Sequence, residues 1–385
     1  MEEIIRSYFM CGLNFSEILT CLSNNDGIAI SMRTLKRILQ RLGLFRRKNY
    51  SDIVDVSLFL LEQIQTSGRQ HGYKMMHLKS IQNGYVVTQE TIRELLHILD
   101  PVGIKNRQRH RLSRRMYSNF GPNYLWHIDG YDKLKPFGIC IHGAIDGFSR
   151  YILWLEAYTT NNDPRVISGY YIGTVECLKG CPFRIRADMG TENGYVRDMQ
   201  ILLRSLGTDG NDSKYYIAGS SNRNQRIERW WGILRTQNVQ YWIEFFTMLE
   251  NMGSFTGNFL DKSLIQFCFM DLIQEDLNTV RQLWNNHRIR RIKNQCSPNG
   301  RPAVMYTCPE LYGTQNYLRP VDRVNIALCA EECVRKDKYC CDETVYEICT
   351  MIIEDHGLTM PRSAEDAAVL YQVLRREILE ELALQ

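Results

Sequence analysis

Three acidic residues are placed where a sheet and a helix could bring their carboxylates to one point. Asp129 follows the apolar residues of an expected strand, Asp188 ends the segment FRIRAD, and Glu228 lies within an expected long helix. Three convergent carboxylates repel one another unless cations neutralise them, and hard oxygen ligands suit Mg²⁺ or Mn²⁺. Two such ions can activate a water or a 3′-hydroxyl and stabilise the leaving oxygen of an in-line phosphodiester displacement. We therefore expect Asp129, Asp188 and Glu228 to be catalytic and to bind two such ions, with no small-molecule cofactor, although each aspartate taken alone is more often a turn or cap residue.

The segment that must position these residues has the pattern of a mixed α/β sheet, and we assign it to residues 121–300. Three strands joined by tight turns are expected within residues 124–158. Beyond them, the pattern predicts strands at 183–188 and 213–218 and helices at 164–178, 194–206 and 224–251. Three consecutive strands followed by alternating helix and strand describe a mixed sheet with flanking helices.

Two all-α units are expected before this core, at residues 1–48 and 49–104. The first contains helices at 2–10, 15–22 and 31–42, and the third of these is apolar on one face. Arg33, Lys36 and Arg37 would line its other face. Three helices with a basic third one are typical of helix-turn-helix DNA-binding units, although plain helical packing would give the same pattern.

A dense basic run, KNRQRHRLSRR, lies in the expected linker at 105–120. It predicts a segment that binds DNA phosphates or serves as a nuclear address, and a solvated linker is the alternative. The candidate phosphate contacts are Arg107, Arg109, Arg111, Arg114 and Arg115.

The composition supports a polyanionic partner and excludes several protein classes. The formal charge is +8 over residues 1–120, +2 over 121–300 and −6 over 301–385, so a basic N-terminal third points to nucleic acid. No run of apolar residues is long enough for a membrane span, and the N-terminus lacks a secretory pattern. An odd total of 13 cysteines without zinc-finger spacing favours reduced thiols over a metal knuckle. We expect a nuclear protein if the host is eukaryotic and a cytoplasmic one otherwise.

The segment from about 50 to 305 resembles retroviral integrases and the insertion-sequence transposases that carry an integrase core. The resemblance is carried by LWHID, AIDGFSRYILWLEAY, RADMGTEN, RIERWWGILR and LWNNHRIR followed by SPNGRPAVMY, in the family's order, with QHGYKMMHLKS similar to the helical arm of the insertion-sequence members. It implies a ribonuclease-H-like core in which Asp129, Asp188 and Glu228 bind the metal ions. It further implies that Arg235 and Asn224 contact DNA and that Glu192 and Asn193 support the site.

The chain departs from the family pattern in three places. Between Asp188 and Glu228 lie 39 residues, a few more than in the retroviral members, and we attribute these to a loop at 207–213. Trp231 stands where the family often has Asn. The retroviral His/Cys zinc module is absent from the N-terminus.

The leading hypothesis is a transposase or integrase that cuts and joins DNA and acts as a homo-oligomer, because two DNA ends must be joined together. The alternatives are a domesticated DNA-binding protein without transposition activity and a ribonuclease-H-like nuclease. Residues 301–385 are expected to be acidic and partly helical, with a helix at 365–384 used for packing or self-association. The apolar face of that helix would comprise Val369, Val373, Leu374 and Ile378.

Overall fold

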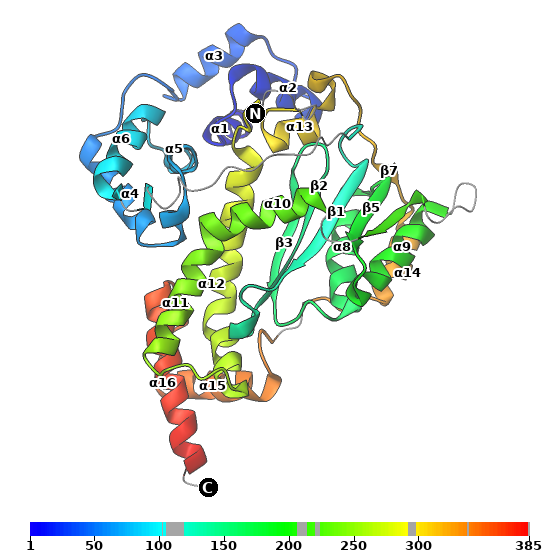
Figure 1. Cartoon of the computed structure of the whole chain (residues 1–385). Helices are drawn as coiled ribbons and strands as arrows, with labels where there is room; N and C mark the ends of the chain where they lie inside the picture. Colours follow the sequence, from blue (N-terminus) through cyan, green and yellow to red (C-terminus); the bar gives the residue numbers. More distant parts are fainter. Residues whose placement is uncertain are drawn as a thin grey trace.

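The computed structural model covers the whole chain and describes residues 1–101, 103–104, 119–205, 214–219, 224–291, 298–336 and 339–383. A twisted five-stranded sheet lies beside a stem of long helices, and two small helical units lie at one end of that stem (Figure 1). The predicted linker arginines Arg107, Arg109, Arg111, Arg114 and Arg115 lie outside the described residues, as does the loop expected at 207–213. No helix in the described ranges is long and apolar enough to cross a membrane.

The N-terminal unit contains α1 (Glu2–Met10), α2 (Phe15–Asp26) and α3 (Met32–Arg41). Asn14 and Glu17 form a reciprocal capping box at the start of α2, and the Ser31 hydroxyl caps α3. These caps define the helix starts because they satisfy backbone N–H groups that have no partner within the helix. The described part of the second unit contains α4 (Ile53–Ile64), α5 (Tyr73–Gln82) and α6 (Gln89–Leu99), packed around their own apolar cluster.

The central sheet has five strands in the order β3-β2-β1-β5-β6. They are β1 (Leu125–Tyr131), β2 (Cys140–Asp146), β3 (Ile152–Tyr158), β5 (Arg184–Asp188) and β6 (Tyr216–Gly219). The pairs β1–β2 and β2–β3 are antiparallel, whereas β1–β5 and β5–β6 are parallel. The mixed sheet predicted from the sequence is confirmed.

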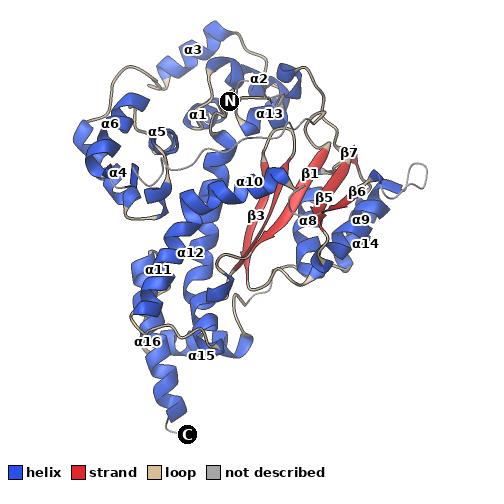
Figure 2. Ribbon diagram, viewed as in Figure 1, coloured by secondary structure: helices blue, strands red, loops and turns tan. Residues whose placement is uncertain are grey.

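Helices cover both faces of the sheet (Figure 2). On one face, α8 (Pro164–Leu178), α9 (Gly194–Ser205) and α14 (Arg323–Glu331) pack with Trp126, Ile128 and Ile185. The other face is covered by α10 (Gln225–Leu234) and the 28-residue helix α12 (Phe259–Asn286), which pack with Ile141 and Leu155. Helix α11 (Gln240–Asn251) belongs to the same apolar cluster. Trp126 and Ile128 of β1 face α8, and side chains alternate along a strand. The odd-numbered residues of β1 therefore face α10.

The helix expected over 224–251 differs from expectation in its middle. A π-helical segment, Arg235–Val239, separates α10 from α11. The buried carboxylate of Asp276 on α12 accepts bonds there from Asn238 Nδ2 at 2.6 Å and Trp242 Nε1 at 2.9 Å, and it also accepts one from Ser67 Oγ at 2.7 Å. These three bonds hold the helix and the second N-terminal unit against the same point of α12.

Beyond the core, the chain packs back on its own earlier segments. Helix α13 (Pro302–Thr307) joins the core of the N-terminal unit, while α15 (Glu343–Asp355) and α16 (Ala364–Ala383) cover α12. The short strands β4 (Gly180–Cys181) and β7 (Arg319–Pro320) pair with each other. The face predicted for the last helix is wrong at Val369, which is 63% exposed, because Leu370 and Tyr371 are buried against the stem instead.

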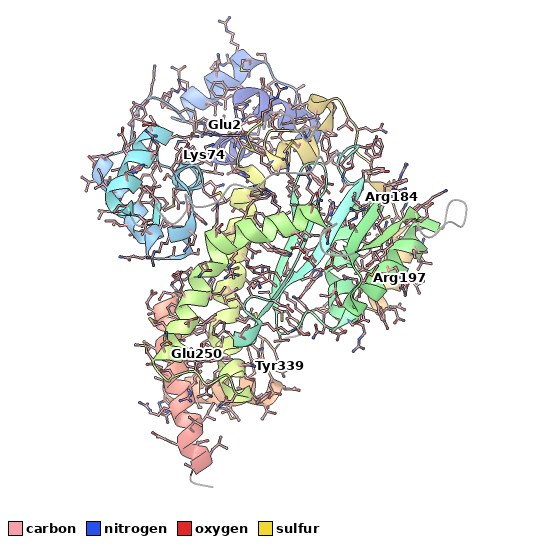
Figure 3. All side chains as sticks on the ribbon, viewed as in Figure 1. Glu2, Lys74, Arg184, Arg197, Glu250 and Tyr339 are labelled. Atoms are coloured by element: carbon pink, nitrogen blue, oxygen red, sulfur yellow. The ribbon has the colours of Figure 1, made fainter. Side chains whose placement is uncertain are left out.

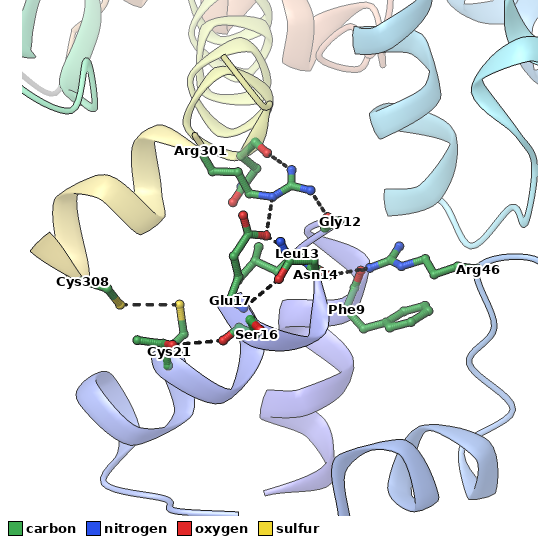
Figure 4. Close-up of polar contacts among 12 residues, drawn as sticks. Phe9, Gly12, Leu13, Asn14, Ser16, Glu17, Cys21, Arg46, Arg301 and Cys308 are labelled. Carbon is green, nitrogen blue, oxygen red and sulfur yellow. Dashed lines mark hydrogen bonds and ion pairs between the residues drawn. The ribbon is translucent and has the colours of Figure 1, made fainter. Parts of the chain in front are cut away.

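Arg301 joins the N-terminal unit to the core. Its guanidinium donates to Glu17 Oε2 at 2.9 Å and to the carbonyl oxygens of Gly12 and Asn286 (Figure 4). Close by, the buried thiols of Cys21 and Cys308 lie 4.0 Å apart. One half-buried cation thus connects α2, the end of α12 and the start of α13.

Candidate active site

Asp129 and Asp188 lie side by side on the sheet face that α10 covers. In β1 and β5 the register pairs His127 with Arg186, and each aspartate is two residues further along its own parallel strand. Ile185 and Ala187 point to the α8 face, so alternation directs Asp188 toward α10, as it does Asp129. The carboxyl ends of two adjacent parallel strands thus present two carboxylates to one helix.

Asn224 determines where that helix begins. Its amide donates to Ile128 O at 2.9 Å, and its Oδ1 lies 2.7 Å from His127 Nδ1. Burial lowers the pKa of His127 to about 3, so the imidazole is neutral and donates to the amide oxygen. These bonds fix the first turn of α10 on β1, and Glu228 follows one turn later on the exposed side.

The three carboxylates act on one another electrostatically. Burial raises the pKa of Asp129 to about 7, against the bond from Trp231, and the charges of Asp188 and Glu228 raise it further. Burial and the charge of Asp188 likewise raise the pKa of Glu228. Burial, followed by the charge of Glu192, raises the pKa of Asp188. Two strands and one helix therefore bring carboxylates from three parts of the chain within electrostatic range of one another.

Trp231 lies over the sheet beside Asp129. Its indole Nε1 donates to Asp129 Oδ2 at 2.7 Å, and its ring is tilted against that of Tyr131 at 5.0 Å between centroids. Gly143 is the register partner of Asp129 on β2. A Cβ atom at Gly143 would lie 2.8 Å from Trp231 Cη2, so this glycine is what admits the ring.

The donor set suits a hard divalent cation, although the carboxylates are not drawn together around one point. Asp188 Oδ1 is buried and has no hydrogen-bond partner among the described residues, which is the condition of an oxygen that lacks a cation or a donor. Within those same residues, no three His, Cys, Asp or Glu side chains are close enough together to hold one ion. The residue types fit Mg²⁺ or Mn²⁺, and the carboxylates would have to lie closer together to share one ion.

The remaining residues expected to bind DNA fall into two groups. Arg33, Lys36 and Arg37 on α3 are exposed, as is Arg235 at the start of the π-helical segment. Asn224 differs from these, because it is 1% exposed and its side chain is engaged within the core. The charge of Glu192 raises the pKa of Asp188. Asn193 Nδ2 donates a hydrogen bond to Glu192 Oε1 at 3.0 Å.

Sequence reasoning missed the roles of His127 and Gly143, and it left that of Trp231 open. A glycine inside an apolar strand marks a place where another group approaches closely, so Gly143 in CIHGAID carried a readable signal. No signal in the sequence identified the group that approaches Gly143, because Trp231 is far from Gly143 along the chain.

Comparison with known proteins gives a family match for the core of the chain. Residues 116–305 match the family model described as Integrase core domain. No curated protein matches the chain. Among solved structures, the chain is similar to one in the cryoEM structure of the simian T-cell lymphotropic virus intasome in complex with PP2A regulatory subunit B56 gamma. The identity is 16% over 65% of this chain and 75% of that chain, with a TM-score of 0.34.

Proposed function

We propose that the protein is a DDE-type recombinase that cuts DNA and joins its ends, because residues 116–305 match the integrase core domain model and contain a mixed five-stranded sheet of the ribonuclease-H-like kind. The observation that carries the proposal is the register of β1 with β5, which places Asp129 and Asp188 next to each other on the sheet face covered by α10, the helix that bears Glu228. A purely structural role does not require carboxylates to lie near one another, since their repulsion destabilises the fold when no cation is present.

In the proposed reaction Asp129, Asp188 and Glu228 hold the divalent cations. Bound there, two Mg²⁺ or Mn²⁺ ions would supply charge neutralisation and activation of a water or 3′-hydroxyl for phosphodiester displacement. The neighbouring side chains hold these carboxylates in position. Trp231 holds Asp129 through one oxygen, and the His127–Asn224 pair holds the helix that carries Glu228. Metal-binding carboxylates generally depend on such hydrogen-bonding partners for their orientation.

DNA is the proposed substrate, and a homo-oligomer is the proposed active form. The cations of α3 in the N-terminal unit and Arg235 at the end of α10 are exposed, and exposed cations suit the phosphate backbone of DNA. Joining two DNA ends needs two copies of the site, so we propose that one copy of the chain handles each end.

The test is metal-dependent cutting and joining of duplex DNA by the wild type and by Asp188→Ala. We expect Mg²⁺- or Mn²⁺-dependent nicks and joined products from the wild type and their loss in the variant. Asp198→Ala, which removes an exposed carboxylate on α9 that pairs with Arg197, is the matched control and should behave as wild type. Equal activity in Asp188→Ala overturns the assignment. DNA binding without cutting would favour the domesticated protein, and cutting of an RNA–DNA hybrid without joining would favour the nuclease.

A further inference from the structure

Three aromatic side chains form a row at one end of the sheet. Tyr124, Phe183 and Tyr215 each come immediately before one of the parallel strands β1, β5 and β6. Neighbouring strands are about 4.8 Å apart, so residues at equivalent positions line up across the sheet. The rings of Tyr124 and Phe183 are stacked with centroids 5.1 Å apart, and those of Phe183 and Tyr215 lie 6.3 Å apart.

Three arginines from separate elements converge on the central ring of this row. Arg184 opens β5, Arg204 lies in the last turn of α9, and Arg319 is in β7. Their guanidinium carbons lie 5.5, 5.0 and 5.8 Å from the centroid of Phe183. We call these six residues the arginine–aromatic cluster.

The cluster has excess positive charge. In the described parts of the chain, none of its arginines forms an ion pair with a carboxylate. The Nε atoms of Arg184 and Arg204 are buried and have no hydrogen-bond partner there. Three like charges held around one ring are stabilised most by an anion that bridges them, because guanidinium groups bind phosphate oxygens through several N–H donors.

The cluster is separate from the carboxylate site. Asp188 ends β5 and Arg184 begins it, so at about 3.3 Å per residue the two are roughly 13 Å apart along the strand. Figure 3 shows Arg184 at the end of the sheet beside β7, and Arg197 farther away on α9. At the cluster's edge, Phe120 packs against Tyr124 with centroids 4.7 Å apart and is 65% exposed, so a base from solution can reach this side chain.

We propose that the arginine–aromatic cluster is a second DNA-binding site, which holds single-stranded DNA with its phosphates on the arginines and a base stacked on Phe120. An exposed ring beside three arginines suits an unpaired strand better than a duplex, in which the base faces are already stacked. The inference rests on the proposed function, because the cluster would give a recombinase a contact for a frayed or displaced strand away from the cutting site.

The test is binding of a fluorescein-labelled 20-mer of single-stranded DNA to the full chain, without divalent metal, over a range of salt concentrations. We expect Arg184→Gln/Arg204→Gln/Arg319→Gln to weaken binding about tenfold and to reduce the salt slope by about 0.7 for each phosphate released. Exposed Arg319→Gln alone should give a smaller change in the same direction, so the test survives if the triple variant misfolds. Arg197→Gln on α9 is the matched control and should bind as wild type.

A second variant separates stacking from charge. Phe120→Ala should weaken single-strand binding about fivefold while leaving the salt slope unchanged, because the ring carries no charge. Wild-type affinity and slope in both the triple variant and Arg319→Gln would overturn the site, and an unaffected Phe120→Ala would overturn the stacked base. These binding measurements do not depend on cleavage. The second DNA site can therefore be disproved while Asp188→Ala still abolishes cleavage, and the recombinase assignment can be disproved while the binding results hold.

Discussion

The indole of Trp231 fixes the orientation of one carboxylate of the candidate site. Its N–H occupies Asp129 Oδ2 at 2.7 Å, and the ring can lie there only because Gly143 has no side chain. Asp129 is thereby left with its other oxygen to offer to a cation. A residue that stands where the resembling family often has Asn thus acts as a hydrogen-bond donor to a metal-binding candidate.

Trp231→Phe should lower the affinity for Mn²⁺ without unfolding the protein. The ring is kept while the donor is lost, and removing a hydrogen-bonding partner of a metal ligand typically costs about 10- to 100-fold in affinity. Gly143→Ala should have a similar effect by displacing the ring, since its Cβ would lie 2.8 Å from the indole. Titration calorimetry with Mn²⁺ measures both variants. An unchanged affinity in Trp231→Phe would show that Asp129 needs no such donor.

At the scale of elements, the C-terminal helix α16 is bound to α12 by a largely buried ion pair. Arg375 Nε donates to Asp261 Oδ1 at 2.7 Å, and the side chains are 23% and 1% exposed. Burial alone would raise the pKa of Asp261, but the bonds from Arg375 and Thr256 outweigh it and hold the pKa below its usual value. The pair therefore stabilises the fold above about pH 4, where Asp261 is ionised in the unfolded chain.

Arg375→Gln should reduce the free energy of unfolding by about 1–3 kcal/mol at pH 7, the range for a hydrogen bond to a charged group. The contribution is lost as the pH falls through the folded-state pKa of Asp261, so the wild type and the variant should converge toward pH 3. Urea unfolding at pH 7, 5 and 3 measures this. Arg376→Gln, on the same helix but in an exposed pair with Glu377, is the control and should match the wild type. A pH-independent difference would rule out the ion pair as its cause.

Elements that are determined by local sequence pattern could be predicted, and those determined by distant contacts could not. The three N-terminal helices and the strands of the sheet depend on local pattern, and they appear in the structure as expected. The π-helical segment at Arg235–Val239 could not be predicted, because Asp276 on a distant helix draws in Asn238 and Trp242. The burial of Asn224 could not be predicted for the same reason, because its hydrogen-bond partner His127 is distant in the sequence.

At the scale of the whole molecule, the core and the N-terminal unit are joined by segments that follow the core in sequence. Helix α13 completes the apolar cluster of the N-terminal unit, and Arg301 bonds to both parts (Figure 4). The three carboxylates could be chosen from the sequence because strand ends and a helix mark them. Their placement near one another depends on the register of β1 with β5 and on the docking of α10, which only the complete fold supplies.

The most direct measurement is a crystal structure of the whole chain soaked in Mn²⁺, with the ions located by anomalous scattering. The account predicts Mn²⁺ bound between Asp129, Asp188 and Glu228, with Asp188 Oδ1, now without a partner among the described residues, among its ligands. Two ions are expected, and Asp188→Ala crystals soaked in the same way should lose them. Saturating Mn²⁺ with no anomalous peak at these carboxylates would contradict the central claim.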